Sequence, residues 1–227
     1  MRNAAQLCLK ATIEDTDWEN SWSIWVYPPL KELNAGDVVL TQDISQALSA
    51  LEAGKKVLLS PRPDKLEGLE GKFLPVFWSP VHFPKQAGTM GILCDPKHPA
   101  LLHFPTEMHS DWQWWTLVKN SRVAVLDSLP QATPIIESID NFANNRRLAS
   151  VFEAQCGKGT LIVSTIDLLS EGTKDKPEVK QLLFSLLQYM NSTSFRPAGK
   201  IEQEALGKLL LREGTKQAKT DATSIYS

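Results

Sequence analysis

A short strand–helix–strand unit near residue 40 constrains the fold of this chain more than any other feature. An apolar run at 38–40 has a strand pattern, and residues 44–53 follow with helical spacing after Asp43 or Ser45, either of which suits a helix N-cap. Gly54 ends the helix before a second β-rich run at 56–59. Strands separated by one short helix are typical of a parallel sheet covered by helices, so the sequence predicts an α/β domain.

The remaining sequence adds strands and helices to this domain. Gly157-Lys158-Gly159 separates two apolar runs, which favours a tight antiparallel hairpin. Residues 60–105 are rich in Pro, Gly and aromatic residues, so we expect mostly ordered loop there. Further strands are expected at 123–126, 135–139, 148–154 and 160–166, with helices at about 111–119 (capped by Ser110), at about 178–190 (opened by Pro177) and from about 201.

The first 27 residues have a different pattern, because apolar and polar residues alternate in two runs separated by a polar segment at 15–21. Period two on both sides of such a segment predicts a β-hairpin. An isolated hairpin is marginally stable in water, so we interpret it as the last strands of a larger sheet, which either dock on the main domain or belong to an upstream one. The expected organisation is 1–29 β-strand segment, 30–198 α/β domain and 199–227 C-terminal helix and tail.

Composition and charge exclude some classes of function. The formal net charge is −2, and Lys and Arg are scattered singly or in pairs, whereas a nucleic-acid-binding surface needs a dense basic face. No apolar run approaches the roughly 18 residues of a membrane span. The three cysteines, Cys8, Cys94 and Cys156, form no CxxC motif, and we expect buried free thiols. Nucleotide-binding glycine motifs are also missing, so no cofactor is expected.

A histidine-rich loop is the first candidate for chemistry. His98, His103 and His109 lie near Asp95 and Glu107, and imidazoles and carboxylates are the groups that bind transition metals. Their spacing on a proline-broken loop does not match a zinc motif. We therefore expect exposed or hydrogen-bonded loop histidines and no metal.

An aromatic cluster is the second candidate. Trp112, Trp114 and Trp115 lie on one expected helix, with Trp78 in the preceding loop. Indole faces stack on sugar rings and also anchor protein interfaces. Because residues 112 and 115 share a helix face that residue 114 does not, one face is expected in the core, and the other is a candidate for carbohydrate or interdomain contact. His109, just before this helix, is a candidate for the same contact.

A polar site is the third candidate. Asp167 follows an apolar strand at the edge where open α/β sheets place ligands, although capping or a loop hydrogen bond is an alternative use of such an Asp. Together with Glu107 and His109 it could serve a hydrolase, if the three side chains converge. No GxSxG or GxCxG nucleophile elbow occurs, so no catalytic residue is assigned.

Three segments resemble a known family. They are WSIWVYP at 22–28, GILCDPKHPALLHFPTEMHSDWQWW at 91–115 and NRRLASVFEAQCGKGTLIVSTIDL at 145–168. Over roughly residues 20–197 the chain is similar to the C-terminal region of bacterial glycoside hydrolase family 2 proteins, the β-galactosidase-like enzymes of Bacteroides. The resemblance implies a flavodoxin-like, class I glutamine amidotransferase-like three-layer sandwich with a mostly parallel sheet, preceded by a hairpin remnant of a β-sandwich.

The resemblance also implies a function. The paired catalytic glutamates of such parents lie in an upstream domain, and the Cys-His-Glu set of amidotransferases cannot be matched here. We therefore expect a non-catalytic accessory domain of a carbohydrate-degrading O-glycosyl hydrolase that packs against the upstream domains of its own chain, in a periplasmic or secreted parent. The alternatives are a stand-alone sugar-active hydrolase or esterase and a weak carbohydrate-binding module. Oligosaccharide is a further candidate partner, whereas nucleic acid and membrane are not expected.

Overall fold

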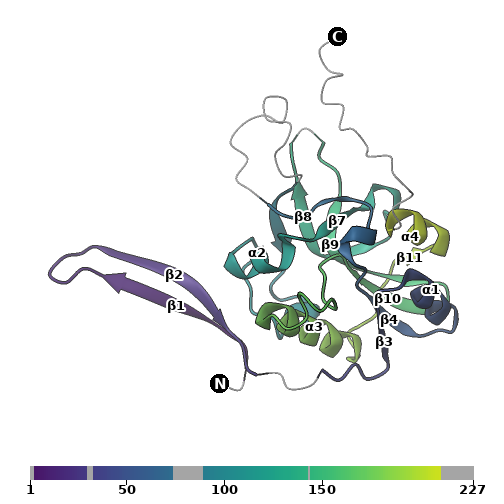
Figure 1. The fold of residues 1–227 in the computed structure, drawn as a ribbon, viewed down its shortest axis with the longest axis horizontal. Helices are drawn as coiled ribbons and strands as arrows, with labels where there is room; N and C mark the ends of the chain where they lie inside the picture. The colour runs from purple at the N-terminus through teal and green to yellow at the C-terminus, as the bar shows by residue number, and fades with distance from the viewer. Residues whose placement is uncertain (1–2, 30–32, 74–88, 143, 211–227) are drawn as a thin grey trace, which may run out of the picture.

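The computed structural model describes residues 3–29, 33–73, 89–142 and 144–210. A two-stranded ribbon projects from a compact domain built on one large sheet (Figure 1). The described strands are β1 (Ala5–Thr12), β2 (Glu19–Val26), β3 (Val38–Thr41), β4 (Lys56–Leu59), β5 (Leu69–Glu70), β6 (Thr89–Cys94), β7 (Arg122–Val125), β8 (Thr133–Asp140), β9 (Leu148–Cys156), β10 (Gly159–Ser164) and β11 (Lys200–Ile201). The α-helices are α1 (Ile44–Glu52), α2 (Trp112–Val118), α3 (Pro177–Met190) and α4 (Gln203–Leu210).

The strand–helix–strand unit forms as expected. The carboxylate of Asp43 accepts a hydrogen bond from the backbone N–H of Gln46 and so caps α1. β3 pairs in parallel with β4, and β4 pairs in parallel with β10, so these three strands are neighbours in the sheet. This parallel half is the part that the alternating pattern predicts.

The other half of the sheet is antiparallel. β9 pairs antiparallel with β10, β8 and β7, and β8 continues to β6 in the same sense. The chain passes directly from β8 to β9 and from β9 to β10 without an intervening helix. Connections that short join antiparallel strands, because a parallel pair needs a crossover of a dozen or more residues. The expected mostly parallel sheet is therefore wrong, and the domain is mixed α/β.

Helices cover both faces of the sheet. Along β4, Leu58 belongs to the core beneath α2 and α3, whereas Val57 and Leu59 belong to the core beneath α1 and α4. This alternation follows from the period of two of a strand. The sheet is therefore the middle of three layers, with an apolar core on each side, and no described helix is long and apolar enough to span a bilayer.

Of two local expectations, one is wrong and one is confirmed. Helix α2 is capped by Asp111 and not by Ser110: the Asp111 carboxylate accepts from the N–H groups of Gln113 and Trp114. The Ser110 hydroxyl instead accepts from the backbone N–H of Ile92 on β6, at 2.7 Å. The tight β9–β10 turn is confirmed, with Gly157 in the left-handed region at φ +58°.

An ion pair between buried Asp140 and partly buried Arg146 fixes the β8–β9 connection. Asp140 accepts hydrogen bonds from the Arg146 guanidinium and from its backbone N–H, each at 2.8 Å. Burial opposes the charged form of Asp140, but the bonds from Arg146 outweigh it and lower the pKa of the carboxyl below its ordinary value. The pair thus stabilises the folded state wherever Asp140 is ionised.

Replacing Asp140 with Asn should lower the free energy of unfolding at pH 7 by about 1.5–3 kcal/mol, the usual value of hydrogen bonds to a charged group. Because the folded-state pKa is lowered, this stabilisation is complete above the ordinary carboxyl pKa of about 4 and is lost as pH falls through the folded-state value. Urea unfolding curves at several pH values measure the difference. The exposed Glu204–Lys208 pair provides the control, and Glu204→Gln should leave stability unchanged.

Candidate functional site

The three tryptophans of α2 have three different environments. Trp114 is fully buried, its indole N–H donates to the Thr106 hydroxyl at 2.8 Å, and its ring meets Phe104 edge-on. Trp115 is partly buried and packs edge-on against Phe73, with ring centroids 5.7 Å apart. Trp112 is 75% exposed. One face of the helix therefore belongs to the core, as expected, and Trp112 is the member available to a ligand or partner. Trp78 lies outside the described residues.

The base of the β1–β2 hairpin is anchored on the start of α2. The Tyr27 hydroxyl donates to Gln113 Oε1 at 2.5 Å, and its ring stacks on Phe104 with centroids 6.3 Å apart. A second bond joins Gln6 Nε2 to Glu107 Oε1 at 2.7 Å. Burial, and then the negative charges of Glu178 and Asp111, raise the pKa of Tyr27, so its hydroxyl remains a donor. Glu107, predicted as part of a polar site, is therefore engaged in holding the hairpin.

Beyond its base the hairpin leaves one apolar face uncovered. Leu7 lies opposite Ile24, and Leu9 lies opposite Trp22, so the four side chains share one face of the ribbon. Their exposed fractions lie between 41% and 53%. Within the described residues β1 and β2 pair only with each other, which leaves the outer edge of each strand open. These four side chains are called the hairpin apolar face below.

The loop histidines have separate roles. His98 accepts from the Ala100 N–H and packs edge-on against Tyr189, while the His103 ring packs against Phe184. His109 is exposed, and its Nδ1 lies 3.1 Å from the carbonyl oxygen of Ser110. In the part of the chain that the structure describes, no three His, Cys, Asp or Glu side chains are grouped so that they could hold a metal ion.

Asp167 lies in a different place, on a pocket of about 660 Å³. Its Oδ1 accepts from the N–H groups of Leu169 and Ser170, the loop role that was the alternative for this residue. Among the described contacts, no hydrogen bond or ion pair joins Asp167 to Glu107 or His109, so the set expected for a hydrolase is not brought together. The pocket also takes side chains that the sequence did not indicate, from Gln42, Arg62 and Asp64. The one sequence feature that could have indicated these residues is their position just after β3 and β4.

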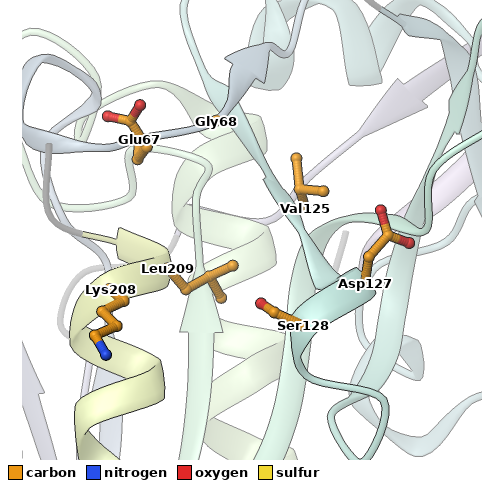
Figure 2. Close-up of a pocket in the computed structure, with 7 residues that line it drawn as sticks. All are labelled: Glu67, Gly68, Val125, Asp127, Ser128, Lys208 and Leu209. Atoms are coloured by element: carbon orange, nitrogen blue, oxygen red, sulfur yellow. The ribbon is translucent and has the colours of Figure 1, made fainter. Parts of the chain in front are cut away.

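A smaller hollow of about 290 Å³ lies where α4 meets the end of β7 (Figure 2). Two of its charged side chains already have structural partners. Asp127 accepts from the backbone N–H of Arg147, and Lys208 pairs with Glu204. The backbone N–H of Glu67 bonds to the Leu210 carbonyl and ties the end of α4 to this hollow. Most of the polar lining of this hollow therefore serves the structure.

The thiols also differ from one another. Cys94 and Cys156 are buried as expected, whereas Cys8, expected to be buried too, is exposed on β1. Burial, with Asp111 as the next cause, raises the pKa of Cys94 to about 12. Burial raises the pKa of Cys156 to about 11, assisted by Glu202 and Glu52. Both thiols are therefore protonated at neutral pH. The nucleophilic form of a cysteine is the thiolate, so neither residue is activated as a nucleophile.

Trp112 and Trp114 make a matched pair on one helix. Trp114→Ala removes a fully buried indole and should cost roughly 3–5 kcal/mol of unfolding free energy. Trp112→Ala removes an exposed side chain and should change stability by less than about 0.5 kcal/mol. Chemical denaturation of both variants measures the contrast. Equal losses would contradict the division of α2 into a buried and an exposed face.

Comparison with known proteins places the domain in a family. A family model described as "Domain of unknown function (DUF8487)" matches residues 38–211, from the first residue of β3 to one residue past α4. The matched region leaves out the β1–β2 hairpin. No curated protein matches the chain. The family model covers more than half of the sequence, and the chain belongs to the DUF8487 family.

Proposed function

We propose that this chain is a non-catalytic accessory domain at the C-terminal end of a larger glycoside hydrolase, and that its hairpin completes a β-sandwich in the domain upstream. The observation that carries the proposal is the hairpin apolar face, which is exposed on a ribbon whose base is firmly anchored. The resemblance of residues 20–197 to the C-terminal region of glycoside hydrolase family 2 proteins is the basis for proposing a glycoside hydrolase as the parent.

Energetics favour a partner for the hairpin. A two-stranded ribbon is marginally stable alone, because it cannot bury enough apolar surface to offset the entropy of ordering the chain. Fully burying one large aliphatic or aromatic side chain is worth about 1.5–3 kcal/mol, so covering the exposed halves of four would add roughly 3–6 kcal/mol. A facing sheet supplies such a cover, since sandwiches pack the apolar faces of two sheets against each other.

Because the base of the hairpin is anchored, docking of the hairpin also determines which side of the domain faces the partner. Tyr27 ties the hairpin to Gln113 in α2, and Gln6 ties it to Glu107 before that helix, so a β-sandwich that takes up the hairpin also approaches α2. Exposed Trp112 then lies on the side of the domain that meets the parent enzyme. This position suits an interdomain contact, and an oligosaccharide held near that junction could stack on the same indole.

The finer fold assignment is part of the proposal. Helices on both faces and the parallel trio β3, β4 and β10 support a flavodoxin-like, amidotransferase-like ancestry. In this account the antiparallel half built on β8 and β9 is the departure from that ancestry. The protonated state of Cys94 and Cys156 fits a domain that does not use the cysteine chemistry of amidotransferases. By the same resemblance, the parent is a periplasmic or secreted enzyme.

The native polypeptide tests the proposal directly. Mass spectrometry of the protein from its natural source should show this sequence within a chain much larger than 25.3 kDa. The preceding part, produced separately, should bind this chain and slow amide exchange in β1 and β2. Leu9→Ser/Trp22→Ser should abolish that complex, whereas Lys10→Ala/Ser21→Ala on the opposite face of the ribbon should not. A native protein of 25.3 kDa, or equal binding by both double variants, would overturn the proposal.

A stand-alone hydrolase or esterase is tested by activity. Because Glu107, His109 and Asp167 each have separate partners, we expect no turnover of nitrophenyl glycosides or acetyl esters by the purified chain. Release of nitrophenol and of acetate measures this. Turnover that is lost in His109→Ala/Asp167→Ala would make the chain an enzyme in its own right.

A further inference from the structure

Three loops meet at one edge of the sheet to form the pocket beside Asp167. They follow the adjacent parallel strands β3, β4 and β10 and contribute Gln42, the segment around Arg62 and Asp64, and the segment from Asp167 to Gly172. Ligands of open α/β sheets bind beyond the carboxyl ends of parallel strands, because the loops diverge there. The pocket has a volume of about 660 Å³, within the usual range of small-molecule sites.

Buried hydroxyl groups form hydrogen bonds with the backbone at the base of these loops. The Ser60 hydroxyl donates to the Ile166 carbonyl at 2.9 Å and accepts from the Leu168 N–H at 3.1 Å, which joins the loops after β4 and β10. Ser164 donates to the same carbonyl at 3.0 Å. On the other side, the Ser60 N–H bonds to the Thr41 carbonyl at the end of β3. The pocket is thus preorganised, which lowers the entropy lost when a ligand binds.

The polar side chains around the pocket retain groups for a ligand. Asp167 uses Oδ1 for its own loop, and Gln42 donates its amide N–H to the Ser170 hydroxyl at 3.0 Å. Arg62 pairs through Nε with Asp64 Oδ1 at 3.0 Å. Within the described residues no hydrogen bond or ion pair involves Asp167 Oδ2, the Gln42 side-chain carbonyl oxygen or the terminal amino groups of Arg62. The pocket therefore offers both hydrogen-bond donors and acceptors to a ligand.

The charges of the pocket select the class of ligand. Arg62 pairs with Asp64 and Lys174 pairs with Glu171, so two of the three carboxylates around the pocket are already balanced by a cation. The remaining charge of Asp167 opposes an anion, and a single carboxylate gives a cation only a weak attraction in solvent. A bound metal ion is not suggested either, because these carboxylates are not grouped as a metal site among the described residues. A neutral molecule with many hydroxyl groups satisfies both donors and acceptors. Leu169 and Pro63 offer apolar contacts to its C–H groups.

We propose that the pocket formed by the loops after β3, β4 and β10 binds a neutral sugar of one or two rings, with Asp167, Gln42 and Arg62 as its hydrogen-bonding residues. This inference is independent of the hairpin and of the parent enzyme, so it stands or falls separately from the accessory role. The proposed ligand binds to Asp167 Oδ2, the carboxylate oxygen that the loop does not use, and not to the tryptophans of α2.

Amide chemical-shift mapping of the full chain tests the site. Glucose, galactose, lactose and cellobiose are titrated separately, with glucose 6-phosphate and putrescine as charged probes. At least one neutral sugar should shift the amides of Asp64, Leu169 and Ser170 saturably, with a dissociation constant of roughly millimolar order, because few contacts are available. Asp167→Asn keeps the Oδ1 acceptor of the loop and removes the free charged oxygen, so it should weaken binding roughly tenfold without unfolding the domain.

Asp95→Asn is the matched control, since Asp95 also accepts from a nearby backbone N–H, that of Lys97, but lies outside the pocket. It should leave the titration unchanged. The proposal is overturned if none of the four sugars shifts the pocket amides up to ~100 mM, well above the millimolar range expected for so small a ligand. It is also overturned if a charged probe binds more tightly than every sugar, if the shifts occur around Trp112 instead, or if Asp167→Asn binds like the original chain.

Discussion

The burial of strand β9 is the constraint on which the rest of the structure depends. Nearly every residue of β9 is shielded from solvent, and the strand pairs with β10, β8, β7 and β11. It is therefore the place where the parallel half of the sheet, with its two-sided helical cover, meets the antiparallel half. Its one buried carboxylate, on Glu153, accepts a hydrogen bond from the Tyr189 hydroxyl of α3 at 2.8 Å. Such pairing is required, because an unpaired polar group in this position would be costly.

The two halves of the sheet position different features of the domain. The antiparallel half carries β6 and the loop that leads to α2, and so it positions the residues that hold the hairpin. The parallel half ends in three loops that share one edge and form the pocket. The proposed interdomain contact and the proposed sugar site are consequently separate features of one domain, and neither needs the other.

The hairpin combines a fixed base with an open face. Tyr27 contributes an aromatic stack and a short hydrogen bond at the point where the ribbon meets the domain. Farther out, cross-strand pairs such as Leu9 and Trp22 hold the ribbon together but leave its apolar side uncovered. A segment of this kind resembles half of an interface, which is the physical basis for placing a partner sheet against it.

The sequence by itself determined the local elements: the hairpin, the strand–helix–strand unit, the Gly157 turn and the long helix behind Pro177. These depend on periodicity, capping and turn residues that lie within a few positions of one another. It also indicated that the tryptophans of α2 would divide between core and surface. Only the tertiary structure decided that the sheet is mixed, that Glu107 serves the hairpin, and that Gln42 meets Ser170 across a separation of 128 residues. Strand order and loop convergence arise from pairing between distant segments, which no local pattern encodes.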